Sequence, residues 1–317
     1  SSGDNLTPVF SPDGTQILFQ SSRDGNLEIY TMNVDGSNQV NITNSPDDES
    51  HPKWSTDGAK IIFDMTRRTD SGSIYEDIFE INADGTGLRR LTSYFERDTY
   101  PSFSPDGSKV LWRRITVDSV NGEQRLNSEI FVMNRDGSNQ LNLTKHTAYD
   151  GYPAWSPDGE AIIFASNRNS SFGLNFHLYV MDSDGSNLRR LIENDGTVTD
   201  VRPMWSQDGR YIVFNRKHNS DAPDGTPEGV MKIHILDLDT VLTCEPSSPS
   251  SLSNRQYFKP HKNKTILTEI ANSRGVAWGD FNNDGYDDLA VANNNYSPPH
   301  IYLSLIHISE PTRLHCI

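Results

Sequence analysis

The chain has 317 residues, of which 34% are hydrophobic, and its formal net charge is -15 at pH 7. The length allows one large domain or two ordinary ones, and no apolar run reaches the roughly 18 residues that a membrane-spanning helix needs. The negative charge disfavours general nucleic-acid binding, which needs clustered lysine and arginine, and it favours a cationic partner or simple solubility.

A seven-residue string recurs five times and organises the first 243 residues. Each copy begins with proline, has an aromatic residue in third place and ends in Asp-Gly, and successive copies lie about 50 residues apart. We call this string the anchor. Its copies are Pro8–Gly14, Pro52–Gly58, Pro101–Gly107, Pro153–Gly159 and Pro203–Gly209. Such a period is typical of blade or solenoid architectures.

The same series of predicted strands follows each anchor. The Asp-Gly turn leads into an apolar run that ends in an aromatic residue, such as Ile17–Phe19, and this combination indicates a hairpin. A variable loop, an alternating strand such as Glu28–Met32 and a second Asp-Gly turn follow, and a short strand ends near Ile42–Thr43. Four strands per repeat describe one antiparallel blade. We therefore predict an all-β fold, a β-propeller of four-stranded antiparallel blades with five visible repeats in a ring of six or more.

The repeat also carries a family resemblance. The strings Pro-x-Trp-Ser-Pro-Asp-Gly, Ile-x-Phe, Ile-Tyr-x-Met-Asn-x-Asp-Gly and Leu-Thr resemble the WD40-like (PD40) repeat of the TolB family of bacterial propellers, over about residues 4–243. The resemblance implies six blades, so one blade is expected upstream or from another part of the chain. It also implies a periplasmic or secreted location. It specifies function less closely, because propellers host many unrelated roles.

The pattern changes after the fifth repeat. We expect propeller repeats over 1–243 and a Ser/Pro-rich linker over 244–256. The stretch 257–302 has two predicted strands around an acidic loop, and it resembles one truncated copy of the FG-GAP or VCBS repeat of secreted bacterial proteins and integrin-like propellers. Residues 303–317 resemble translated sequencing-adapter read-through, and we set them aside from fold and site reasoning.

The acidic loop is a candidate calcium site. Oxygen ligands stand at alternate positions 1, 3, 5, 7 and 9 of the loop, with the fourth supplied by a backbone carbonyl, and they converge because the loop curls around the ion. They are Asp280, Asn282, Asp284, Tyr286 and Asp288. Strands flank this loop and valine stands at position 12, so the pattern favours Ca²⁺ in an FG-GAP site over an EF-hand. The alternative is a solvated acidic hairpin.

A second candidate site lies three residues before the anchor proline. Four repeats carry an acid there: Glu49, Asp98, Asp150 and Asp200. The strand that follows should be the innermost of its blade, so we expect these side chains to ring one mouth of the central channel. Carboxylates held together repel one another, which raises their pKa or attracts a cation. The ring is thus a hypothesis for binding a basic peptide or a metal ion. The alternative is that each acid caps a turn or bonds the neighbouring blade's backbone.

Two classes of function fit these features. The first is a non-catalytic, extracytoplasmic binding scaffold that recognises protein or glycan through a propeller face and carries a calcium-stabilised FG-GAP module. The second is the propeller of an enzyme, either a prolyl-oligopeptidase-like serine peptidase or a polysaccharide lyase, whose catalytic part lies outside this chain. The sequence has no Gly-x-Ser-x-Gly motif, and its histidines are scattered among the repeats. The scaffold is therefore the preferred interpretation.

Overall fold

The computed structural model is built of β-strands and carries no helix in the parts of the chain that it describes. Within those parts, nothing helical is long and apolar enough to cross a bilayer. The described residues are 3–68, 72, 74–95, 97–120, 123–168, 175–192, 197–218, 231–238, 273–279, 288–293 and 300–302.

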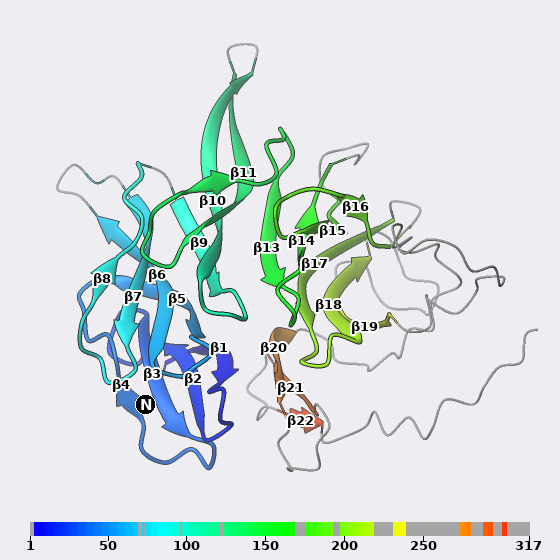
Figure 1. Cartoon of the computed structure of the whole chain (residues 1–317). Helices are drawn as coiled ribbons and strands as arrows, with labels where there is room; N and C mark the ends of the chain where they lie inside the picture. The colour runs from blue at the N-terminus through cyan, green and yellow to red at the C-terminus, as the bar shows by residue number, and fades with distance from the viewer. Residues whose placement is uncertain are drawn as a thin grey trace, which may run out of the picture.

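Antiparallel meanders follow one another along the chain, as the repeat predicts (Figure 1). The first blade has β1 (Asn5–Phe10), β2 (Gln16–Ser21), β3 (Glu28–Asn33) and β4 (Val40–Asn41). The second has β5 (Asp48–Trp54), β6 (Lys60–Arg68), β7 (Ile74–Asn82) and β8 (Arg89–Arg90). The third has β9 (Arg97–Phe103), β10 (Lys109–Val120), β11 (Glu123–Asn134) and β12 (Leu141–Asn142). One parallel pair, Glu76 with Arg97, joins the second blade to the third.

Two further blades complete the predicted five. The fourth has β13 (Asp150–Trp155), β14 (Ala161–Ser166), β15 (His177–Asp182) and β16 (Arg189–Arg190). The fifth has β17 (Val198–Trp205), β18 (Tyr211–His218) and β19 (Met231–Asp237). This sheet has three strands among the described residues, which fits the sequence, because the repeat pattern decays after the third strand of the fifth copy. The propeller prediction is confirmed.

Three more strands come from the stretch predicted as the FG-GAP repeat. They are β20 (Ser273–Gly279), β21 (Asp288–Asn293) and β22 (His300–Tyr302), and they form one sheet in the order β20-β21-β22. Strand β20 contacts both β1 and β19, so this sheet lies between the first blade and the fifth (Figure 1). That is the place where a sixth blade would stand.

The anchor explains how each blade begins. In the third blade, the Ser104 hydroxyl donates to Asp106 Oδ1 at 2.5 Å and accepts from the Lys109 amide at 2.9 Å. Gly107 closes the turn with φ near 68°, a left-handed conformation that glycine adopts without strain. The other four anchors repeat the serine-to-aspartate bond. The anchor therefore forms the turn of a β-hairpin and fixes where the second strand starts.

The core lies in layers between neighbouring blades. One layer joins Leu18 and Ile29 of the first blade to Trp54 and Phe63 of the second. Equivalent clusters lie between the second and third, third and fourth, and fourth and fifth blades. Full burial of one such side chain contributes about 1.5–3 kcal/mol relative to exposure. The blades are thus held together mainly by these apolar layers, while polar side chains of the inner strands remain available for other roles.

Candidate binding site on the inner strands

A β-bulge recurs in the innermost strand of all five blades. The pairing of the first strand with the second shifts register immediately before the anchor proline. The residue that precedes the proline has positive φ each time, with values of 48°, 51°, 56°, 55° and 56° along the chain. These residues are Thr7, His51, Tyr100, Tyr152 and Arg202. We call them the bulge ring.

This conformation is unusual for the residues that adopt it. Non-glycine residues seldom have positive φ, and a residue before proline normally prefers extended backbone. Strain of this kind costs on the order of 1–3 kcal/mol per residue and persists only where the surroundings enforce it. Its repetition at one position in five blades indicates a built feature of the inner strands.

Side chains of the bulge ring converge from different blades. The His51 and Tyr100 ring centroids are 3.7 Å apart, and those of Tyr100 and Tyr152 are 5.0 Å apart. The Arg202 guanidinium carbon lies 5.6 Å from the Tyr152 centroid. The first strands of successive blades also contact one another. These side chains therefore meet around the propeller axis.

The bulge itself puts these side chains on the inner face. Positions two apart in a regular strand share a face, so Tyr100 would lie on the same side as Asp98. Instead, the Arg113 guanidinium lies over the Tyr100 ring at 4.8 Å, and Arg113 pairs across the strands with Thr99 rather than with Asp98. The extra residue thus moves Tyr100 to the opposite face from the acid.

Polar side chains of the second strands hold the bulges in place. The His51 amide donates to Gln20 Oε1 and the Tyr100 amide donates to Asp64 Oδ1, each at 3.1 Å. In both pairs the acceptor belongs to the preceding blade. Asp64 Oδ1 also lies 2.9 Å from His51 Nδ1. These two bulges are therefore fixed partly by the blade before them.

Arg113 occupies the corresponding position in the third blade. Its side chain is buried, and its Nε donates to Thr99 Oγ1 at 3.0 Å while Nη1 donates to Tyr149 Oη at 3.1 Å. Tyr149 and Tyr152 also present rings to the guanidinium, at 5.7 Å and 5.9 Å. Burial raises the pKa of Tyr100 to about 12, so its phenol remains a hydrogen-bond donor at neutral pH. We call this part of the inner strands, formed by Arg113, Tyr100, Tyr149 and Tyr152, the inner wall; it combines aromatic faces with positive charge.

The four predicted acids lie away from solvent. Glu49, Asp98, Asp150 and Asp200 are each 0% exposed. Arg114 binds Asp98 through two bonds of 2.7 and 2.8 Å, and Arg216 binds Asp200 in the same way. These side chains do not line an open mouth as expected, because each pair closes against its own blade. A partner could contact the carboxylates only after the ion pairs opened, and the binding role predicted for them stays a prediction.

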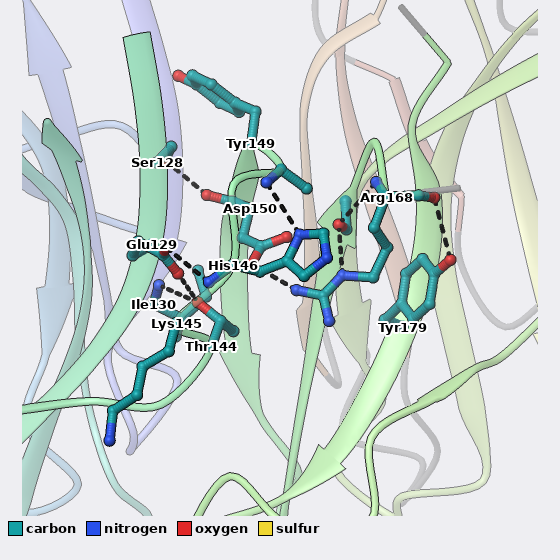
Figure 2. Close-up of polar contacts among 12 residues, drawn as sticks. Ser128, Glu129, Ile130, Thr144, Lys145, His146, Tyr149, Asp150, Arg168 and Tyr179 are labelled. Atoms are coloured by element: carbon teal, nitrogen blue, oxygen red, sulfur yellow. Dashed lines mark hydrogen bonds and ion pairs between the residues drawn. The ribbon is translucent and has the colours of Figure 1, made fainter. Parts of the chain in front are cut away.

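Asp150 shows how such an acid is embedded (Figure 2). Arg168 donates to Asp150 Oδ2 at 2.6 Å, and the Ser128 hydroxyl of the preceding blade donates to the Asp150 carbonyl at 2.6 Å. Burial raises the pKa of Asp150, and Arg168 opposes that shift. Nearby, burial likewise raises the pKa of Glu129, which accepts from Thr144 Oγ1 and from the His146 amide. This network joins the third and fourth blades.

Glu49 differs from the other three acids. Met65 pairs across from it where the equivalent residues are arginine in two other blades. Ser45 Oγ donates to Glu49 Oε1, and Oε2 has no partner among the described residues. Burial raises the pKa of Glu49 to about 8. This carboxyl is therefore largely protonated at neutral pH.

The predicted calcium ligands lie almost wholly outside the described residues. Asp280, Asn282, Asp284 and Tyr286 fall in the undescribed stretch 280–287, and Asp288 begins β21. Among the described residues, no group of three or more His, Cys, Asp and Glu side chains is placed to hold a metal ion. The calcium assignment stays a prediction.

The bulge ring escaped sequence reasoning. The only available signal is position, because each member directly precedes an anchor proline, but the five residue types differ in size, charge and polarity. Nothing in their order indicates positive φ. A search for a repeated residue type selects the acids two positions earlier, which the bulge places on the other side of the strand.

Comparisons with known proteins agree with this architecture. The family model for the TolB β-propeller domain matches residues 1–76 and 119–223, together more than half of the chain, and that for the FG-GAP repeat matches 273–300. A TolB homologue of Chlorobium chlorochromatii is 28% identical over 51% of this chain and 34% of its own length. The first curated relatives thus share only about a third or less of their length with this chain.

Solved structures show the same fold at low identity. The chain superimposes on a TolB protein of Agrobacterium tumefaciens with a TM-score of 0.58 and 21% identity, over 75% of this chain and 79% of the other. An oligogalacturonate lyase of Vibrio parahaemolyticus also matches, with a TM-score of 0.58 and 13% identity, over 95% and 78%. Likeness at such identity reports architecture alone.

Proposed function

Since this chain belongs to the TolB β-propeller domain family, we propose that it is a non-catalytic, extracytoplasmic binding scaffold that takes a polypeptide segment at the inner face of its propeller. A periplasmic or secreted location is part of the proposal and follows from the family. The single observation that carries it is the bulge ring, where five blades hold one position at positive φ and the dissimilar side chains of four of them meet.

The chemistry of the ring suits a peptide. His51, Tyr100 and Tyr152 offer aromatic faces, and Arg113 and Arg202 offer hydrogen-bond donors and positive charge. Aromatic and arginine side chains dominate the energy of protein recognition sites. The expectation of a basic partner rested on the net charge of -15 and on a ring of four carboxylates, and arginine pairs with three of these. The proposal therefore rests on the bulge ring.

An array of short synthetic peptides probed with the full chain tests this function. We expect a subset of peptides to bind, and we expect Tyr100→Ala and Tyr152→Ala each to weaken that binding about tenfold or more, as loss of an aromatic hot spot does. Leu88→Ala is the control, since Leu88 is 52% exposed and directly precedes β8, the strand farthest from the inner strand of its blade. Binding that survives both tyrosine substitutions would exclude the ring.

We also propose that the FG-GAP segment binds Ca²⁺ through the acidic loop at 280–288. The donor set supports this, because carboxylate, amide and carbonyl oxygens at alternate positions are the ligands that Ca²⁺ prefers. Calorimetric titration of the full chain should show calcium uptake, and Asp284→Ala should abolish it while magnesium gives no comparable signal. Equal uptake by the variant would rule out this loop.

A further inference from the structure

Arg113 differs from its counterparts in the first two blades. These counterparts, Gln20 and Asp64, accept a hydrogen bond from the bulge amide of the next blade. A guanidinium has no acceptor atom, so Arg113 cannot hold the Tyr152 amide in this way. The third blade thus has a donor where the first two blades have an acceptor, and the fourth has Ala165 there.

Arg113 also differs from the other buried arginines in its counter-charge. Arg114, Arg168 and Arg216 each form an ion pair with an aspartate of the inner strand. Among the described residues, no carboxylate pairs with Arg113. Two of its five N–H donors have acceptors, in Thr99 and Tyr149. A buried cation without a counter-ion is costly, and tyrosine faces offset only part of this cost.

The surroundings of Arg113 combine aromatic rings with a second positive charge. The Arg113 guanidinium lies 4.8 Å from the Tyr100 ring and 5.9 Å from the Tyr152 ring, and the Arg202 guanidinium lies 5.6 Å from the Tyr152 ring, which concentrates positive charge here. The whole chain carries a charge of -15, which repels polyanions such as nucleic acid. A segment with a single carboxylate suffers little of that repulsion, and the planar guanidinium matches a carboxylate in two-bond geometry.

We propose that Arg113 anchors a carboxylate subsite in the inner wall and that the peptide taken by the bulge ring presents either its C-terminal carboxylate or an aspartate or glutamate side chain to it. This inference rests on the proposed function. It adds the chemical group that the site selects. It also accommodates a basic segment, provided that one carboxylate reaches Arg113.

The test uses the full chain and short peptides that contain one tyrosine and differ in a single feature. One peptide has a free C-terminus, the second is amidated, and the third is amidated but carries an internal aspartate. We expect the free or the aspartate peptide to bind about tenfold to hundredfold more tightly than the neutral amide, as a charge-assisted hydrogen bond provides. Which of the two binds identifies the source of the carboxylate.

Substitutions at Arg113 then separate recognition from folding. Arg113→Met should remove the preference for a carboxylate, and a circular dichroism spectrum and an unfolding midpoint that match those of the parent protein show that the ring is still folded. Arg113→Lys keeps the charge but loses the planar fork, so we expect a partial preference. Leu88→Ala should bind all three peptides as the parent protein does.

Three outcomes would overturn the proposal in distinguishable ways. Equal binding of the neutral and carboxylate peptides rejects the subsite and leaves the peptide scaffold standing. If the parent protein binds none of the peptides, both the carboxylate subsite and the peptide scaffold are rejected. Binding of galacturonate oligomers through Arg113, with no peptide bound, rejects the peptide and assigns the subsite to an acidic glycan.

Discussion

Two positions on the same inner strand, only two residues apart, have opposite environments. Asp98, Asp150 and Asp200 are buried against arginines of their own blade, whereas His51, Tyr100 and Tyr152 meet side chains from other blades around the axis. The β-bulge within this strand places Asp98 and Tyr100 on opposite faces. The chain thus divides two tasks, holding a blade together and presenting a surface, between neighbouring residues of one strand.

The difference follows from charge and backbone strain. An aspartate opposite an arginine in a buried pair gains a partner at a fixed distance and loses contact with solvent. A bulge residue gains exposure to the axis, and its backbone accepts a conformation that most side chains avoid. Repetition of a residue type therefore marks the structural position here, and variation of residue type marks the position that faces the axis.

The largest expected effect comes from breaking a buried pair. Asp98→Ala leaves the Arg114 guanidinium buried without its partner, and such a loss costs about 3–5 kcal/mol of unfolding free energy. Urea unfolding followed by circular dichroism measures it. The double variant Asp98→Leu with Arg114→Met removes both charges and should recover most of the loss. A cost below about 1 kcal/mol for the single variant would show that the pair behaves like an exposed one.

A smaller, pH-dependent effect is expected at Glu49. Its folded pKa is about 8, against an ordinary value of 4.5, so between these values the folded state keeps a proton that the unfolded state has released. Stability therefore falls as pH rises through this window and is lowest above about pH 8. Glu49→Gln should remove that fall, a gain on the order of a few kcal/mol at the alkaline end.

Unfolding midpoints for the parent and Glu49→Gln proteins, measured near the two ends of the window, provide the check. The two proteins should be closest at the acidic end. A constant difference across the window would mean that Glu49 is ionised in the folded protein, in conflict with its burial and its unpartnered Oε2.

The smallest effect concerns the strain in the bulge. Thr7 is β-branched and has a φ of 48°, so Thr7→Gly should relieve strain of about 1–2 kcal/mol, less the entropy cost of glycine at about 0.5–1 kcal/mol. The variant also loses the 2.9 Å bond from Thr7 Oγ1 to Gln20 Oε1, worth about 0.5–1.5 kcal/mol, so we expect a net change within about 1 kcal/mol of zero. Thr31→Gly, in the regular strand β3, should instead destabilise the protein. A loss at Thr7 as large as that at Thr31 would contradict the proposed strain.

Much of the fold could be predicted from the sequence because its signals are local. The Ser and Asp of each anchor close a turn within a few residues, and the threonine of the Leu-Thr pair accepts the strand amide beside it, as Thr92 does from Ile78. Such short-range bonds repeat with the residues that make them. The five blades and the order of their strands can therefore be predicted from the sequence alone.

The binding surface could not be predicted in the same way. Its members come from separate blades, and the contact of Arg113 with Tyr152 depends on how the third blade packs on the fourth. The acids lie on the inner strands, but the arginine partners of Asp98 and Asp200 stand in the next strand, at positions that the strand pairing defines. Whether a charge faces solvent or a partner depends on that register.

The bulge amides have a consequence for how such a protein can be rearranged. His51 and Tyr100 are each held by a side chain of the blade before them, so a repeat copied or transplanted alone would arrive without the acceptor for its own bulge. The repeats look interchangeable in sequence, but the unit that can be exchanged spans the second strand of one repeat and the first strand of the next. Recombination between blades should therefore succeed when the crossover falls in the turn between the first and second strands of a blade, because the acceptor and the bulge then stay together. Circular permutation should be tolerated best where the new termini do not separate a bulge from its acceptor.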